Sequence, residues 1–167
     1  MNSKEKPRRA AFDKALSLIE RQERTEYQIR LSLTKAGYDE DEANEALARL
    51  IDAGLVNDRE YAGRYLEILI EKRRGRRRVV DEMRRRGLDA FLIEDVLAEG
   101  YPEDVEEANA LVVARKALDK LPDDLDKRAD RRKIAGKISI KLTGQGYNFD
   151  LINRTVEKVL GDLEQES

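Results

Sequence analysis

The chain has 167 residues, of which 40% are hydrophobic and 41% charged, with only three Pro and ten Gly. This composition is typical of proteins built from long helices rather than of β-sandwiches. The 33 basic and 35 acidic residues leave a net charge of −2, so the total charge gives no bulk attraction to nucleic acid. Because the chain contains no Cys and no His, the usual zinc, haem and nucleophilic-cysteine chemistries lack their ligands and bases. We therefore expect no cofactor and no catalytic activity.

No apolar run approaches the roughly 20 residues that a membrane span needs. The first twelve residues, MNSKEKPRRAAF, lack the apolar stretch of a signal peptide. The sequence therefore predicts a cytoplasmic protein, expected to be a monomer, with no membrane partner.

The predicted elements begin with three helices in residues 1–56. The first carries an apolar stripe formed by Phe12, Ala15, Leu16 and Ile19. The second carries Ile29 and Leu33 and ends at Gly37, which suits the left-handed residue that follows a helix. After the large residue Tyr38, Asp39 is a good cap for the third helix.

The same order of elements recurs in residues 57–101. Asn57 starts a capping box that opens a helix with the predicted core stripe Tyr61, Tyr65, Ile68 and Leu69. The next helix carries Val79 and Met83, four residues apart, and ends at Gly87. Leu88 takes the corner position and Asp89 caps the third helix.

A third copy of this pattern occupies residues 102–167. Its first helix carries the predicted stripe Val105, Ala108, Leu111, Val112 and Leu118. Ile138 and Leu142 precede Gly146, and Tyr147 and Asn148 complete the corner. The first two corner glycines are 50 residues apart and the last two 59, so we predict an inserted loop near residues 121–130, where Pro122 interrupts the helix. This loop is a candidate hinge.

The three copies predict an all-α fold of three tandem three-helix repeats, about nine helices in all. Such repeats cannot bury their apolar faces alone and stack against their neighbours, which favours an elongated, curved body. The alternative is that the three modules pack into one compact bundle.

The most pronounced feature of the charge pattern lies in the second repeat. Between Lys72 and Arg86 there are nine basic and two acidic residues, a net charge of +7 in fifteen positions. Guanidinium groups suit the recognition of phosphate or carboxylate, so we predict a partner-binding or DNA-binding strip. The basic strip, as we define it, comprises Lys72, Arg73, Arg74, Arg76, Arg77, Arg78, Arg84 and Arg85. The alternative is a solvated helix face, in which Asp81 and Glu82 pair with arginines four residues away.

Other motifs have structural explanations. Tyr61 and Tyr65 could stack on bases, but their spacing fits a core stripe. Gly144 and Gly146 lack the preceding strand and the third Gly of a dinucleotide-binding loop. The acidic run 39–42 lacks the ligand spacing of a calcium loop, and capping of a helix start explains it.

The segment Leu50-Ile51-Asp52-Ala53-Gly54-Leu55-Val56-Asn57-Asp58-Arg59-Glu60-Tyr61-Ala62, followed by the basic strip and Arg86-Gly87-Leu88-Asp89, resembles the RecX regulatory proteins of bacteria. The resemblance continues into the third repeat as Gly146-Tyr147-Asn148-Phe149-Asp150-Leu151-Ile152. It implies tandem three-helix repeats that bind the RecA recombinase, lie in the groove of its filament on single-stranded DNA, and damp ATP hydrolysis, strand exchange and co-protease activity.

Two hypotheses about function, and one more general possibility, follow. The first is a non-enzymatic modulator of the RecA filament that reaches single-stranded DNA through the filament. The second is a stand-alone helical-repeat protein whose strip binds nucleic-acid phosphates directly. A helical scaffold for an unrelated partner is the third possibility.

Overall fold

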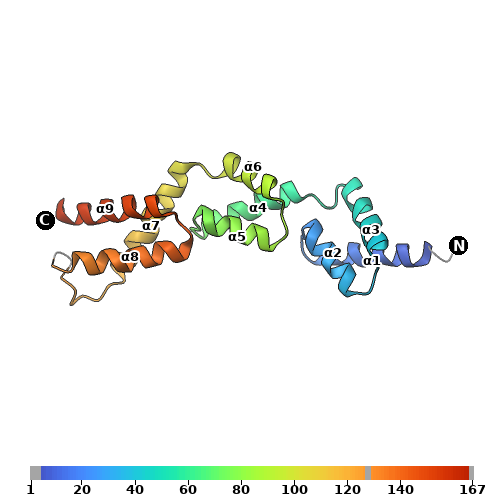
Figure 1. Ribbon diagram of the computed structural model, residues 1–167, viewed down its shortest axis with the longest axis horizontal. Helices are drawn as coiled ribbons and strands as arrows, with labels where there is room; N and C mark the ends of the chain where they lie inside the picture. The colour runs from blue at the N-terminus through green and yellow to red at the C-terminus, as the bar shows by residue number, and fades with distance from the viewer. Residues whose placement is uncertain (1–4, 127–128, 166–167) are drawn as a thin grey trace. The chain divides into compact units, whose positions relative to one another are not determined.

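The computed structural model describes residues 5–126 and 129–165, and within these residues the chain forms nine α-helices and no strand (Figure 1). The helices are α1 (Glu5–Arg21), α2 (Glu26–Lys35), α3 (Glu40–Asp52), α4 (Asp58–Glu71), α5 (Arg76–Arg85), α6 (Ala90–Gly100), α7 (Glu103–Asp119), α8 (Arg131–Gln145) and α9 (Phe149–Gln165). The prediction of an all-α fold is confirmed.

The predicted corners between helices are confirmed. Gly37, Gly87 and Gly146 adopt left-handed conformations, with φ angles of 92°, 72° and 91°. In the first corner the Asp39 carboxylate accepts the Glu42 N–H at 2.8 Å, and in the third the Asn148 side chain accepts an N–H of α9 at 2.8 Å. These caps satisfy backbone donors that a helix start leaves unpaired.

A left-handed residue also ends α4, but here it is an arginine. Arg73 has a φ of 59° and is the one non-glycine residue with a positive φ in the described part of the chain. The Arg74 N–H bonds the Leu69 carbonyl at 3.0 Å and the Arg73 N–H bonds the Ile70 carbonyl at 2.9 Å, which is the closure expected of such a turn. Because this conformation costs an ordinary residue roughly 1–2 kcal/mol, the contacts of Arg73 offset a real strain.

The chain divides into two compact units. The first contains the residues up to Tyr65 together with Met83–Glu94, and the second contains Leu66–Glu82 together with the residues from Asp95 onward. Helices α1–α3 pack together in the first unit, and α7–α9 pack together in the second. Helices α4, α5 and α6 each contribute residues to both units.

Each bundle has its own apolar core. The core of the first unit is formed by Ala11, Ala15, Ile29, Leu33, Ala43, Ala46, Leu47, Leu50 and Val56. The core of the second unit is formed by Ala110, Val113, Ala114, Leu118, Ile134, Ile138, Leu142, Tyr147, Leu151, Ile152, Val156, Val159 and Leu160. The paired positions predicted in the second helix of each repeat, which include Val79 and Met83, are all fully buried.

Two predicted stripes are partly wrong. In α4, Ile68 is 46% exposed, and the buried residues are Ala62, Leu66 and Leu69. In α7, Ala108 is exposed, whereas the polar residues Glu106 and Asn109 are buried. The apolar pattern could not identify this face because the buried polar groups are satisfied by partners from distant segments.

The predicted loop in the third repeat separates α7, which ends at Asp119, from α8, which begins at Arg131. Its first part contains a turn in which the Leu125 N–H bonds the Pro122 carbonyl at 3.1 Å. Residues 127 and 128 of this loop lie outside the described residues. The role of the loop as a hinge stays a prediction.

Within the described residues, every helix is too short or too polar to cross a membrane.

Candidate functional site

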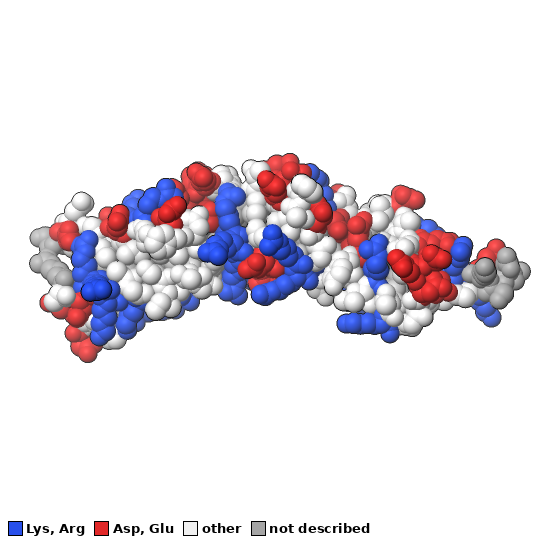
Figure 2. All heavy atoms as spheres, in the orientation of Figure 1, with Lys and Arg blue, Asp and Glu red and all other residues white. Residues whose placement is uncertain are grey.

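The residues of the basic strip lie on helix α5 and on the turn that precedes it. The helix buries Val79 and Met83 on one face, so its arginines lie on the flanks and on the outer face. Figure 2 shows Lys and Arg side chains gathered over α5, with acidic side chains among them. The structure divides the strip into arginines bound within the protein and cations that face solvent.

Arg76 is bound within the second unit. The Glu106 carboxylate of α7 accepts the Arg76 backbone N–H at 2.9 Å and its Nε–H at 2.9 Å. The guanidinium also donates to the Tyr101 carbonyl and lies 5.4 Å from the centre of the Tyr101 ring. The side chain of Glu106 is only 5% exposed. Arg76 therefore neutralises a buried carboxylate and caps its own helix through the same partner.

Arg73 and Arg74 lie in the turn between α4 and α5. The Arg73 guanidinium donates to the Asn109 side chain, and the Arg74 guanidinium donates to the Gln145 side chain. Their carbonyls are also used, because Tyr147 donates its hydroxyl to Arg73 at 2.6 Å and Tyr101 donates its hydroxyl to Arg74 at 2.7 Å. Arg73 therefore joins the turn to α7 and to the α8–α9 corner, and Arg74 joins it to the end of α8 and to the residue pair that precedes α7.

Burial raises the pKa of both tyrosine hydroxyls above the usual value near 10. For Tyr147 the nearby Tyr101 hydroxyl adds to this effect, whereas for Tyr101 the hydrogen bond from Asn109 opposes it. Both hydroxyls keep their protons at neutral pH, as their donation to backbone carbonyls requires.

The start of α5 lies directly against the α8–α9 corner. The Gly75 N–H donates to the Gln145 carbonyl at 2.8 Å, and the Arg77 N–H donates to the Gly146 carbonyl at 3.1 Å. A side chain at Gly75 would overlap the backbone of Gly146 and Tyr147. The two backbones meet because position 75 is a glycine.

Four residues of the strip face solvent. Lys72, Arg77, Arg84 and Arg85 are exposed, and within the described residues none of them forms a side-chain hydrogen bond or ion pair. Arg78 is intermediate: it donates to the Gly144 carbonyl at 2.9 Å and lies 3.6 Å from the Glu82 carboxylate. The solvated-face alternative therefore holds for the pair of Arg78 and Glu82.

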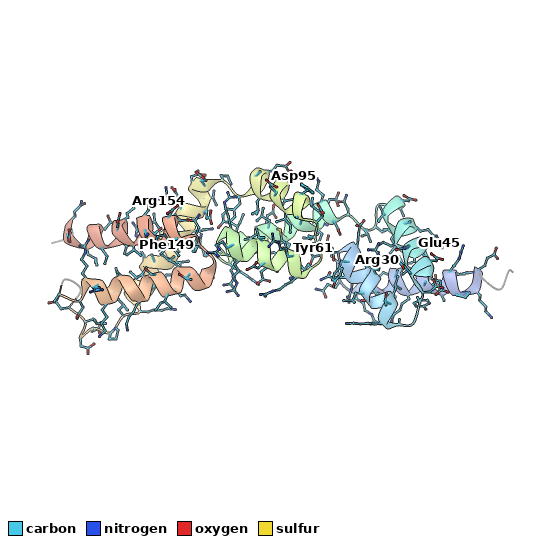
Figure 3. The ribbon with its side chains drawn as sticks, viewed as in Figure 1. Arg30, Glu45, Tyr61, Asp95, Phe149 and Arg154 are labelled. Carbon is cyan, nitrogen blue, oxygen red and sulfur yellow. The ribbon has the colours of Figure 1, made fainter. Side chains whose placement is uncertain are left out.

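Arg86, which follows the strip, is held in the first unit by two tyrosines. Its Nε–H donates to the Tyr61 hydroxyl at 2.8 Å, and its guanidinium lies 3.8 Å from the centre of the Tyr65 ring. The two rings are 6.0 Å apart and partly buried. Tyr61, labelled in Figure 3, thus supports a cation rather than lying in the apolar core.

The first unit contains a counterpart of the pair formed by Arg76 and Glu106. There the Asp58 carboxylate of α4 accepts the backbone N–H of Glu26, the first residue of α2, at 2.9 Å. The two repeat junctions therefore share one device, in which a carboxylate from the following repeat caps the middle helix. In the first junction the capped residue is itself acidic.

Burial raises the pKa of Asp58, although the hydrogen bond from the Glu26 backbone opposes the shift. Burial also raises the pKa of Glu26, and the neighbouring Asp58 raises it further, whereas Arg30 lowers it. The first junction thus holds two carboxyl groups whose pKa is raised by burial, whereas the second junction holds an ion pair.

Sequence reasoning missed a second basic surface. In the second unit, a cavity of about 540 Å³ is lined by Glu71, Lys72, Arg73, Val113, Lys116, Ala117, Lys120, Lys141 and Gln145. We call this cavity the α7–α8 groove. Two of its five cations, Lys72 and Arg73, belong to the basic strip, and the other three are lysines of α7 and α8 that lie outside any local run of charge. The available signal was lysines at intervals of four, in Lys116 with Lys120 and in Lys137 with Lys141.

Two segments of the chain, which correspond to the first two repeats, match family models of known proteins. Residues 11–50 match the family model described as RecX, first three-helix domain, and residues 57–97 match RecX, second three-helix domain. The chain is 30% identical over 146 residues to the Regulatory protein RecX of Clostridium botulinum (strain Alaska E43 / Type E3), covering 87% of this chain and 66% of that protein. It is 31% identical over 150 residues to the Regulatory protein RecX of Streptomyces coelicolor, covering 89% of this chain and 79% of that protein. It thus spans about two thirds of the length of the clostridial relative.

Solved structures share the fold. The crystal structure of RecX from Lactobacillus salivarius has a TM-score of 0.80 at 23% identity, covering 92% of this chain and 96% of that chain. A second crystal structure, of regulatory protein RecX, has a TM-score of 0.74 at 21% identity and covers 90% of this chain and 72% of that one.

Proposed function

Because this chain belongs to the RecX family of regulatory proteins, we propose that it is a non-enzymatic regulator of the RecA recombinase filament. It binds the filament on single-stranded DNA and modulates, mostly by inhibition, the ATPase, strand-exchange and co-protease activities. Residues 1–56, 57–101 and 102–167 act as three successive three-helix repeats.

The observation that supports this proposal is the set of unpaired cations on and beside α5. Arg77, Arg84 and Arg85 are exposed. Arg77 and Arg84 are seven residues apart on one helix, which places them roughly 20° apart around its axis. Guanidinium groups held in this way are ready to bind carboxylates of a protein surface or phosphates of a nucleic acid.

The bound arginines of the strip have a supporting role in the proposal. Arg73, Arg74 and Arg76 fix the turn and the start of α5, the helix that carries the exposed arginines. Within the predicted strip we assign direct partner contact to Lys72, Arg77, Arg84 and Arg85, and positioning to the others.

Inhibition then results from a preference of the protein for one state of the filament, and not from a reaction that the protein catalyses. A regulator that contacts adjacent filament subunits shifts the balance between filament states by the difference in its affinity for them. Three repeats in one chain allow several subunits to be contacted at once, which raises affinity without any new type of contact.

The test is a titration of the protein into preformed RecA filaments on single-stranded DNA, with ATP hydrolysis as the readout. Fluorescence anisotropy of the protein with bare DNA runs in parallel. We expect inhibition at concentrations well below those that bind bare DNA. Unchanged hydrolysis at saturating protein would contradict the proposal.

A second candidate function is a stand-alone nucleic-acid module, and the cationic lining of the α7–α8 groove favours it. A protein that neutralises about four phosphates of a single strand has a log-log salt slope of roughly −3, since each contact contributes about −0.7. Steep salt dependence on bare DNA together with unchanged ATP hydrolysis would support this function instead.

A further inference from the structure

The α7–α8 groove concentrates positive charge where the fold does not need it. Its lining has five basic residues and one acidic residue, Glu71. Lys72, Lys116, Lys120 and Lys141 are exposed and make no ion pair within the described residues. Like charges gathered in a concave surface repel one another, so this arrangement brings no folding benefit of its own.

Other cations of the same bundle form ion pairs between its helices. Between α7 and α9, Arg115 lies 3.3 Å from Asp162, and Arg154, labelled in Figure 3, lies 3.2 Å from Glu107. Arg131 of α8 likewise forms an ion pair with Glu164 of α9. Cations that hold this bundle together are therefore arginines paired with acids, whereas the groove presents unpaired lysines.

The positive charge extends beyond the groove as a line. Lys133, Lys137 and Lys141 follow one another at intervals of four on α8, so they occupy one side of the helix and rise roughly 6 Å at each step. Lys116 and Lys120 repeat this interval on α7. A row of point charges at regular steps fits an extended polyanion better than a compact ion.

Apolar surface accompanies the lysines. Val113 and Ala117 line the groove, and Ile140, which is 75% exposed, lies on the same side of α8 as Lys133 and Lys137. Lysines bind phosphates as point charges without reading sequence, and aliphatic side chains offer van der Waals contact to unpaired bases. A single nucleic-acid strand offers both kinds of group.

We propose that the α7–α8 groove and the lysine row of α8 form a binding site for the phosphate backbone of a single nucleic-acid strand. The choice of polymer rests on the proposed function, which places this protein on a filament assembled on single-stranded DNA. The site lies within the second unit, and its binding is independent of base sequence and sensitive to salt.

The test compares two full-length variants with the same change in charge. Lys116→Glu with Lys120→Glu reverses two groove cations, and Lys14→Glu with Lys158→Glu reverses two exposed lysines of α1 and α9 that lie outside the groove. Fluorescence anisotropy of a labelled single-stranded oligonucleotide is measured across a salt series.

We expect the groove variant to bind about tenfold or more weakly than the control variant. Its log-log salt slope should be shallower by roughly 1.4, because two contacts are lost at about 0.7 each. Equal affinities for the two variants would overturn the proposal, as would the absence of measurable binding by the unaltered protein.

Poly-glutamate of similar length serves as a competitor. If it displaces the oligonucleotide at equal charge concentration, the groove accepts any polyanion and the assignment to nucleic acid fails. Inhibition of RecA ATP hydrolysis is measured on the same samples. If the unaltered protein inhibits hydrolysis but does not bind the oligonucleotide, the groove proposal fails and the proposed function stands. If it binds the oligonucleotide but does not inhibit hydrolysis, the proposed function fails and the groove proposal stands.

Discussion

The Glu106 carboxylate accepts two hydrogen bonds from Arg76, one from its backbone N–H and one from its Nε–H, both at 2.9 Å. One buried acid thus caps α5 and neutralises its first side chain. Removing one partner of a buried pair leaves the other charge unpaired, which typically costs about 3–5 kcal/mol. Because the Arg76 side chain is 32% exposed, water relieves part of this cost.

We predict that Glu106→Ala lowers the free energy of unfolding by about 2–4 kcal/mol, measured by urea denaturation. Arg76→Ala should cost more, since it leaves the Glu106 carboxylate, whose side chain is only 5% exposed, without its counter-charge. The double variant should lose less than the sum of the two single losses, because the two groups interact.

The exposed pair of Arg115 and Asp162 provides the control. Arg115→Ala should change stability by less than about 1 kcal/mol. Losses of similar size for Arg115→Ala and Glu106→Ala would contradict the account of the buried pair.

Gly75 tests the close contact between α5 and the α8–α9 corner. Gly75→Ala should destabilise the protein by about 1–3 kcal/mol, because the new methyl group overlaps the Gly146 backbone. Gly136→Ala, in the interior of α8 with open space around it, should instead stabilise by about 0.5–1 kcal/mol. Thermal melts of both variants measure the difference, and the same sign for both would argue against the contact.

The amino-acid pattern predicted the helices and corners well because both depend on local chemistry. Gly37, for example, has open space around it and needs only its own left-handed conformation and the cap provided by Asp39. The pattern also placed Val79 and Met83 in the core, since their spacing of four matches one face of a helix.

The sequence could not show which arginines are bound within the protein. Arg76 and Arg77 are adjacent and chemically identical, yet one meets a buried carboxylate thirty residues away and the other faces solvent. Glu106 and Asn109 were missed for the same reason, because their burial depends on partners that only the folded chain brings close. The α7–α8 groove likewise combines charges from three separate segments.

The tyrosine hydroxyls predict a loss of stability in alkali. Burial raises the pKa of Tyr101 and Tyr147 in the folded state, so the folded protein holds protons that the unfolded chain releases near pH 10. Their contribution is therefore fully present below pH 10 and is lost as the pH rises toward the folded-state pKa. Urea denaturation between pH 9 and about 11 should show this decline.

Tyr101→Phe with Tyr147→Phe should cost about 1–2 kcal/mol at pH 7, from two lost hydrogen bonds, and should flatten the alkaline decline. Tyr38→Phe, at the equivalent corner of the first repeat, is the control and should leave the decline in place. A double variant with an unchanged alkaline profile would show that these hydroxyls do not cause it.

The carboxyl groups of the first junction predict a change in stability in the acidic range, below pH 7. Burial and the nearby Asp58 raise the pKa of Glu26, so its ionisation opposes folding at neutral pH. The contribution of a group with a raised pKa is fully present below the unfolded value near 4 and is lost as the pH rises through the folded value. Glu26→Gln should therefore raise the free energy of unfolding at pH 7, and the gain should vanish near pH 4.

Glu40 is the matched control, since it is the first residue of α3 as Glu26 is of α2, but it is exposed. Glu40→Gln should give no gain at pH 7, because it only removes a favourable charge from a helix start. Equal effects of the two variants at pH 7 would contradict the account of the first junction.

We propose that exposed arginines of α5 bind the RecA filament while the bound ones hold the helix in place. The most direct measurement is the inhibition of RecA ATP hydrolysis by Arg77→Glu with Arg85→Glu, compared with unaltered protein. We predict that inhibition requires at least about tenfold more of the variant, with its helicity and melting temperature nearly unchanged. Unchanged inhibition by a folded variant would contradict the claim.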